Sequence, residues 1–114
     1  MKNIELNTIK KGDIWIVVNP NSVGQMQKGL RPHVIVTQVT GNTVTVAPCT
    51  SVEKRLKYIV KIEPTEMNGL DLRSFVLLSQ SFAADTSLLE KRIGHLDESD
   101  IMKIQLEYVK YVTD

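Results

Sequence analysis

The sequence has few of the residues that stabilise small secreted proteins or hold metal ions. Of its 114 residues, one is cysteine and two are histidine. The single cysteine, Cys49, excludes an internal disulfide and suits a reducing compartment, so we expect a cytoplasmic protein. The two histidines lie far from the cysteine, without the spacing of a zinc site, and we expect no metal or cofactor.

Long hydrophobic runs are also missing. No apolar stretch approaches the roughly 20 residues of a membrane-spanning helix, and the N-terminus lacks an apolar segment of signal-peptide length. We therefore expect no membrane partner. Internal repeats, low-complexity segments and interdomain linkers are absent as well. With 42% hydrophobic and 24% charged residues, the composition is that of one soluble domain over residues 1–114, with residues 1–11 as an N-terminal extension.

The net charge of +1 conceals an uneven distribution of charge along the chain. Residues 1–61 contain nine Lys and Arg against three Asp and Glu, whereas residues 62–114 contain five against ten. A basic first half favours a local site for an anion. Ordinary solvated surface charge would give the same division, so the alternative stays open.

Apolar and turn-forming residues predict several short strands followed by helices. A continuous apolar run indicates a buried strand, and β-branched runs on both sides of Gly41-Asn42 indicate a hairpin. The polar connection between the apolar run and the hairpin, residues 19–29, is long for a compact domain, which is typical of functional loops. The predicted strands are residues 13–18, the two arms of the hairpin within 29–51, and residues 58–62 and 74–78.

Two helices are predicted after the last strand. Asp85-Thr86-Ser87 can cap a short helix through Leu88, Leu89 and Arg92 that ends at Gly94. Asp97 or Ser99 can cap a final helix to about Val112, whose inner face has the spacing of Ile101, Ile104, Gln105, Tyr108 and Val112. This order predicts an α+β, mainly β fold: a small, strongly bent sheet or barrel with a short helix and a C-terminal helix.

The hairpin places a cation and a hydroxyl at one end of the sheet. Arg31 opens the first arm and Thr50 leaves the second, so in a regular antiparallel pair they lie about 5 Å apart across the ladder. We take this end of the hairpin as the candidate active site. Arg31 could instead form a surface ion pair with Glu53 or Asp13, and Thr50 could reflect strand propensity alone.

A series of motifs runs from Gly12 to near the C-terminus. In order they are Gly12-Asp13-Ile14, the loop end Gln27-Lys28-Gly29-Leu30-Arg31-Pro32, Pro48-Cys49-Thr50-Ser51, Leu77-Leu78-Ser79-Gln80 with Asp85, and Lys91-Arg92-Ile93-Gly94-His95-Leu96-Asp97. Together they resemble the MazF/PemK/Kid family of toxins. The resemblance implies an SH3-like barrel of the CcdB/PemK type, a homodimer, and a cognate antitoxin protein as partner.

The resemblance further implies an endoribonuclease that cuts single-stranded RNA at short sequences and so inhibits translation. In such cleavage the 2′-hydroxyl attacks the adjacent phosphorus, which needs no metal if the protein stabilises the phosphorane. Arg31 and Thr50 are the expected catalytic residues, with Arg31 acting by charge because an arginine side chain loses its proton only above about pH 12. The expected RNA-binding residues are Gln27, Lys28, Ser51, Lys54, Arg55, Gln80 and Asp85.

Some of these residues have a structural alternative. Asp85 is also a good helix cap, and Lys54 and Arg55 could belong to a solvated loop rather than contact phosphates. His33 lies two positions after Arg31 and would share its face of a regular strand. Its imidazole suits proton transfer near neutral pH, although packing at a strand end is the alternative.

Two positions depart from the family pattern. Phe82 stands where many members have a phosphate-binding arginine, and Gln25 stands where some have a histidine. Phe82 could stack on a base or simply pack in the core. These departures favour a second hypothesis, a non-catalytic relative that binds RNA or a partner protein. A gyrase poison of the CcdB type ranks last, because such proteins end in Trp-Gly-Ile and this chain ends Tyr111-Val112-Thr113-Asp114.

Overall fold

The computed structural model describes residues 8–18 and 30–114. In this part of the chain seven strands, two short 3₁₀ helices and one α-helix follow one another. No helix among these residues is long and apolar enough to cross a membrane. The elements are β1 (Asp13–Val18), β2 (Leu30–Ile35), β3 (Thr43–Thr50), β4 (Ile59–Ile62), β5 (Ser74–Leu77), η3 (Leu78–Gln80), β6 (Phe82–Asp85), η4 (Thr86–Leu88), β7 (Leu89–His95) and α1 (Glu98–Thr113).

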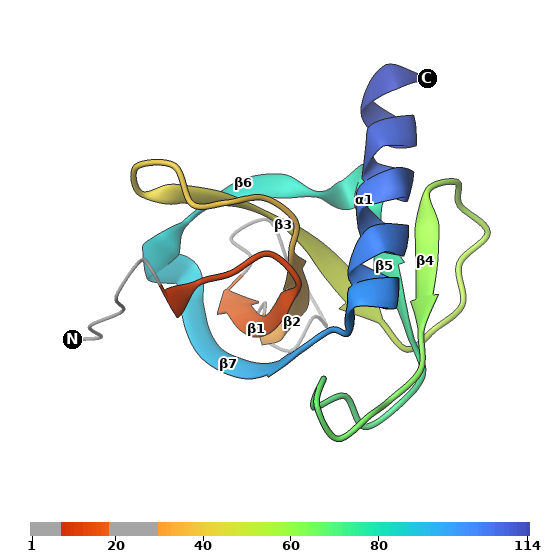
Figure 1. The fold of residues 1–114 in the computed structure, drawn as a ribbon, viewed down its shortest axis with the longest axis horizontal. Coiled ribbons are helices and arrows are strands. Elements are labelled where there is room, and N and C mark those ends of the chain that lie inside the picture. Colours follow the sequence, from red (N-terminus) through yellow and green to blue (C-terminus); the bar gives the residue numbers. More distant parts are fainter. Residues whose placement is uncertain (1–7, 19–29) are drawn as a thin grey trace.

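The strands form one antiparallel sheet in the order β4-β5-β3-β2-β1-β7, with β6 also paired to β3. β3 is the long central strand: its first half pairs with β6 and its last two residues pair with β5. Figure 1 shows the sheet bending, with β7 curling around β1 and with α1 beside β4 and β5. The prediction of a bent, mainly β sheet with a C-terminal helix is confirmed, and the sheet in the described residues stays open.

The alternation of side chains along the strands fills two hydrophobic cores on opposite faces of the sheet. On β2, for example, Val34 points into one core and Ile35 into the other. The first core lies between the sheet and α1 and includes Ile104, which is buried. The second lies inside the curl of the sheet and includes Trp15 and Ile9. Ile9 thus ties part of the expected N-terminal extension into the fold.

The hairpin between β2 and β3 has the predicted turn. Gly41 adopts a positive φ of 61°, which glycine tolerates without strain. Thr40 and Thr43 exchange backbone hydrogen bonds across this turn, at 2.9 and 3.0 Å. The turn fixes the register of the hairpin, and this register determines which residues meet at its far end.

The predicted helix from Asp85 to Arg92 is wrong. Only one 3₁₀ turn, η4, forms there, capped by the Asp85 carboxylate, which accepts a hydrogen bond from the backbone N–H of Ser87. The chain then continues as β7 along β1, which buries Leu89 completely. Pairing with an otherwise unpaired edge of β1 therefore overrides the local helical spacing.

The final helix begins where the sequence indicates, but the face that packs against the sheet is narrower than predicted. The Asp97 carboxylate accepts a hydrogen bond from Asp100 N at 2.8 Å and caps α1. Ile104 is buried, with Ile101 and Tyr108 packed against the same core. Gln105 and Val112 are exposed, so their predicted place on the inner face is wrong. Only one edge of the helix contacts the sheet.

Candidate active site

The open ends of β2 and β3 border a pocket of about 380 Å³. His33 pairs with Pro48, and this antiparallel register brings the start of β2, with Arg31, to the same end of the sheet as the end of β3, with Thr50. Arg31, Thr50 and Ser51 all line this pocket. The remaining lining residues are Leu30, Pro32, Cys49, Val52, Leu70, Asp71, Leu72 and Ser74.

A hydrogen bond just beyond the end of β3 orients the Thr50 hydroxyl. Thr50 Oγ1 accepts a hydrogen bond from the backbone N–H of Val52 at 3.1 Å, which holds the side chain in place where the strand ends. Because the oxygen accepts this bond, its own hydrogen stays available to a ligand in the pocket. A positioned hydroxyl donor is suited to an anionic oxygen.

Arg31 brings a positive charge to the same pocket. Its side chain is half-buried, and no hydrogen bond or ion pair joins its guanidinium to another described residue. The alternative ion pairs to Glu53 and Asp13 are therefore not formed; Asp13 instead bonds Arg92 and His95. A guanidinium that bonds none of the described side chains can offer two parallel N–H donors to a phosphate.

His33 is fully buried and does not line the pocket. Its Nδ1 lies 2.9 Å from the carbonyl oxygen of Arg31, which can only accept, so Nδ1 carries the proton. No described residue bonds the buried Nε2. Burial lowers the pKa of His33 from 6.5 to about 4. The structure thus supports packing and backbone positioning for His33 rather than proton exchange with a ligand.

We expect burial of His33 to make the fold sensitive to acid. Folded His33 resists protonation down to about pH 4, whereas the unfolded chain takes up the proton near pH 6.5. The free energy of unfolding should therefore fall as the pH drops from 6.5 to 4, by up to about 1.4 kcal/mol per pH unit from this residue. Urea unfolding of the wild type and of His33→Gln across this range measures the difference. Equal pH slopes for the two proteins would contradict this account of His33.

Cys49 lines the pocket but cannot act as a nucleophile there. Its side chain is only 4% exposed. Burial raises the pKa of the thiol to about 12, although the Arg31 charge acts in the opposite direction. The thiol therefore remains protonated at neutral pH and contributes packing.

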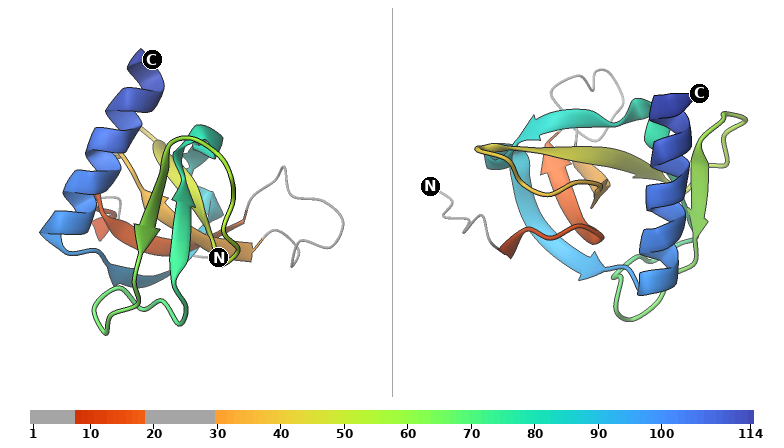
Figure 2. Two further views of the ribbon diagram at one scale, coloured as in Figure 1. Left: turned by 90° about the vertical axis from the view of Figure 1, so that its right-hand side faces the viewer. Right: turned by 45° about the horizontal axis from the view of Figure 1, so that its top comes forward.

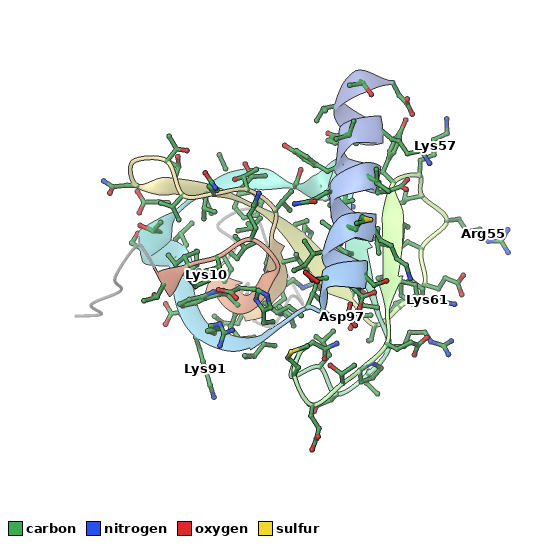
Figure 3. The ribbon with its side chains drawn as sticks, in the orientation of Figure 1. Lys10, Arg55, Lys57, Lys61, Lys91 and Asp97 are labelled. Carbon is green, nitrogen blue, oxygen red and sulfur yellow. The ribbon has the colours of Figure 1, made fainter. Side chains whose placement is uncertain are left out.

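Other predicted RNA-binding residues lie away from the pocket. Lys54 and Arg55 are exposed on the connection from β3 to β4, and Figure 3 shows Arg55 projecting away from the body of the molecule. Gln80 is exposed at the end of η3. Asp85 pairs with Thr43, at the opposite end of β3 from Thr50. Gln27 and Lys28 lie outside the described residues.

The Phe82 side chain packs against other side chains of the protein. It pairs with Val46 and is half-buried against the second core. Its ring meets that of His33 edge to face, with centroids 5.9 Å apart. This contact explains why a phenylalanine is accommodated here, since a buried neutral imidazole and an aromatic ring suit each other.

One wall of the pocket was not identified from the sequence and is formed by residues later in the chain than Arg31 and Thr50. Leu70, Asp71 and Leu72 line it, and all three lie outside the strands predicted from the sequence. They arrive there because β5, which follows them, pairs with the end of β3, with Thr50 opposite Phe75. No local sequence pattern predicts such a long-range pairing.

Comparisons with known proteins agree with this fold. A sequence model of the family described as "PemK-like, MazF-like toxin of type II toxin-antitoxin system" matches residues 10–109. The Endoribonuclease MazF of Staphylococcus epidermidis is 31% identical over 101 residues, which is 84% of each chain.

Solved structures with the same fold include a Mycobacterium tuberculosis toxin, MazF-mt6. It superposes with a TM-score of 0.68 at 25% identity, covering 88% of this chain and 95% of its own. An endoribonuclease from a mycobacterial species, solved in complex with its cognate antitoxin, gives a TM-score of 0.69 at 14% identity. That alignment covers 90% of this chain and 92% of the other, and at this identity it shows the fold alone.

Proposed function

Because the chain belongs to the family of PemK-like, MazF-like toxins of type II toxin–antitoxin systems, we propose that it is a metal-independent endoribonuclease. Its substrate is single-stranded RNA, including messenger RNA, cut at particular short sequences in the cytoplasm, so that translation stops. The observation that carries the proposal is the pocket shared by Arg31 and Thr50. These two residues provide a charge and a hydroxyl donor at one place.

The chemistry follows from what each residue can do. The 2′-hydroxyl attacks the adjacent phosphorus, and the pentacoordinate phosphorane carries extra negative charge on its free oxygens. Arg31 donates to two of these oxygens, and Thr50 donates its hydroxyl hydrogen to one of them. Donors already aimed at developing charge lower the barrier because they need no reorganisation during the reaction. The products are a 2′,3′-cyclic phosphate and a free 5′-hydroxyl.

Neighbouring residues extend the RNA path. Ser51 lines the pocket directly after Thr50 and can bond a second phosphate oxygen. Gln27 and Lys28 precede β2 in the sequence, close to Arg31 along the chain. Lys54 and Arg55 would meet phosphates further from the cut, which adds affinity that falls with salt but no base selection.

The direct test incubates the purified protein with a long unstructured RNA in excess EDTA. Discrete cuts with cyclic phosphate and 5′-hydroxyl ends, at the same rate with and without the chelator, are the expected result. The matched control is Thr50→Val, which keeps the shape and β-branching of the side chain but removes the donor. Intact RNA at enzyme concentrations above that of the substrate would contradict the proposal.

The second candidate function is a non-catalytic relative that binds RNA or a partner protein. It is favoured by Phe82, which occupies the family's arginine position and packs on His33. Its signature would be salt-dependent RNA binding without cleavage, even in Phe82→Arg. Discrete cleavage by the wild type would eliminate it.

The proposed partners are a cognate antitoxin and a second copy of the chain. For the second copy, the observation is an apolar stripe on the outer side of α1, where Met102, Leu106, Val109 and Val112 are each more than half exposed. A groove between α1 and β4 runs beside the stripe and includes Leu106 and Val109. Exposed apolar side chains gathered on one helix face are typical of an interface.

Leu106→Lys should convert the homodimer to a monomer. A lysine at the centre of the stripe would bury an unpaired charge in the interface, while leaving the monomer fold intact because the position is solvent-exposed in a single chain. Sedimentation velocity measures the mass of both proteins. The control is Ser99→Lys, which adds the same single charge at an exposed position on the first turn of α1. A Leu106→Lys variant that remains dimeric would place the interface elsewhere.

A further inference from the structure

The candidate active site lacks an evident group to remove the proton from the 2′-hydroxyl. Among the described residues that line the pocket, three have titratable side chains: Arg31, Cys49 and Asp71. A guanidinium remains charged and cannot accept a proton near neutral pH. Cys49 is buried with its proton retained. Of the three titratable side chains, Asp71 is therefore the one that can accept a proton near neutral pH.

The two histidines and Asp85 are badly placed for this task. His33 is fully buried with Nδ1–H committed to Arg31 O. His95 bonds Asp13, and both lie toward the end of β1 opposite the Val17–Arg31 pair. Asp85 caps η4 at the far end of β3. In the sequence of residues 19–29, the only titratable side chain is Lys28, which is no proton acceptor at neutral pH.

The segment that carries Asp71 is firmly held. Just before it, the buried Asn68 accepts hydrogen bonds from Thr65 N and Leu70 N at 3.0 Å and donates to Glu63 O at 2.9 Å. Just after it, Ser74 Oγ donates to Leu72 O at 3.0 Å. Both neighbours of Asp71 are thus fixed by internal bonds, which aligns the segment before any substrate arrives.

The Asp71 side chain itself is available. It is exposed, and no hydrogen bond or ion pair joins its carboxylate to another described residue. Its segment also borders a second, adjoining pocket, which is lined by Glu53 and Glu63 and shares Ser51, Asp71 and Leu72 with the first. Asp71 therefore stands at the boundary between the two pockets, and it lines the same pocket as Arg31 and Thr50.

We propose that Asp71 is the general base of the cleavage reaction, an inference that rests on the proposed endoribonuclease function. The Asp71 carboxylate accepts the proton of the 2′-hydroxyl as the O2′–P bond forms. The P–O5′ bond breaks, and the departing 5′-oxygen takes a proton from water. Asp71 then returns its proton to solvent. Atoms and charge balance without a metal ion or a further reactant.

The test compares wild type, Asp71→Asn and Glu53→Gln in single-turnover cleavage at one mapped site, with enzyme in excess over RNA. Asparagine keeps the size of the side chain but cannot take the proton, so the rate should fall about 100- to 10,000-fold. The acid limb of the pH–rate profile should disappear with it. Glu53→Gln removes a carboxylate from the adjoining pocket alone and should retain the wild-type rate and profile.

A second substrate identifies the direction of proton transfer. In an RNA whose departing 5′-oxygen is replaced by sulfur, the leaving group no longer needs a proton. A variant that has lost its base stays slow on this RNA, whereas a variant that has lost an acid recovers. We expect Asp71→Asn to stay slow.

Three results would overturn the inference while leaving the endoribonuclease function standing. They are wild-type rates in Asp71→Asn, recovery of Asp71→Asn on the thio substrate, and an unchanged rate with altered cut sites, which would make Asp71 a base-recognition residue. Failure of the wild type to cut any RNA would instead contradict the proposed function itself. Circular dichroism of both variants confirms that the compared proteins are folded.

Discussion

Replacing Arg31 by alanine is expected to slow RNA cleavage by about 100- to 1,000-fold at saturating substrate. The guanidinium is the one positively charged group among the described residues that line the pocket, and its loss leaves the Thr50 and Ser51 hydroxyls to stabilise the phosphorane. Single-turnover cleavage of one mapped site measures the effect. The stability of the variant should differ little from that of the wild type, because the half-buried side chain bonds no other described residue.

Arg31→Lys separates charge from geometry. Lysine keeps the positive charge but replaces the planar fork of donors with a single ammonium group, so we expect a rate between those of the wild type and Arg31→Ala. Undiminished cleavage in Arg31→Ala would show that the reaction takes place at another site. Equal rates in the lysine and alanine variants would show that the two-donor geometry, rather than charge alone, controls the rate.

Replacing Asp13 by alanine should cause the largest loss of stability that the described contacts predict. The Asp13 carboxylate is fully buried and accepts four hydrogen bonds or ion pairs. Its partners are Lys10 N at 3.0 Å, Trp15 Nε1 at 3.4 Å, Arg92 Nε at 3.2 Å and His95 Nδ1 at 2.7 Å. These bonds join β1 and the segment before it to β7, so they hold together the curled part of the sheet.

Without the carboxylate, buried donors lose their acceptor. Removing one partner of a buried ion pair costs about 3–5 kcal/mol, and we expect the lower end because the side chains of Arg92 and His95 are 49% and 30% exposed and can reach water. Urea unfolding at pH 7 measures the loss. At about 4 °C for each kcal/mol, the melting temperature should fall by roughly 12 °C.

Asp13→Asn is the matched control, since it retains an oxygen acceptor and the side-chain volume and should lose less stability than Asp13→Ala. Activity gives a further check. Asp13 lies four residues along β1 from Val17, which pairs with Arg31, so the folded fraction of either variant should still cleave RNA at the wild-type rate. A melting temperature unchanged in Asp13→Ala would contradict the stabilising role of this cluster.

The parts of the site that could be predicted from the sequence depend on local structure. The Gly41 turn sets the register of β2 against β3, and with that register Arg31 and Thr50 come to one end of the sheet. Helix α1 could be located because its cap, Asp97, is also a local signal. In each case the residues that determine the structure are close together in the sequence.

The parts that could not be predicted depend on pairing between distant segments. Residues 89–92 have helical spacing, yet they extend along β1 because that pairing buries Leu89 and satisfies the β1 edge. Asp71 reaches the pocket through the pairing of β5 with β3, 25 residues away in the chain at the Thr50–Phe75 pair. Figure 2 shows how far the sheet bends to bring such segments together. Composition and periodicity carry no information about contacts of this kind.

The most direct measurement of the central claim is a crystal structure of the protein with an uncleavable RNA that has 2′-deoxyribose at the mapped cut site. With the attacking hydroxyl absent, the scissile phosphate should be trapped between the Arg31 guanidinium and the Thr50 hydroxyl, with both within hydrogen-bond distance of its oxygens. A scissile phosphate bound anywhere else on the protein, with the Arg31 pocket unoccupied by RNA, would contradict the account.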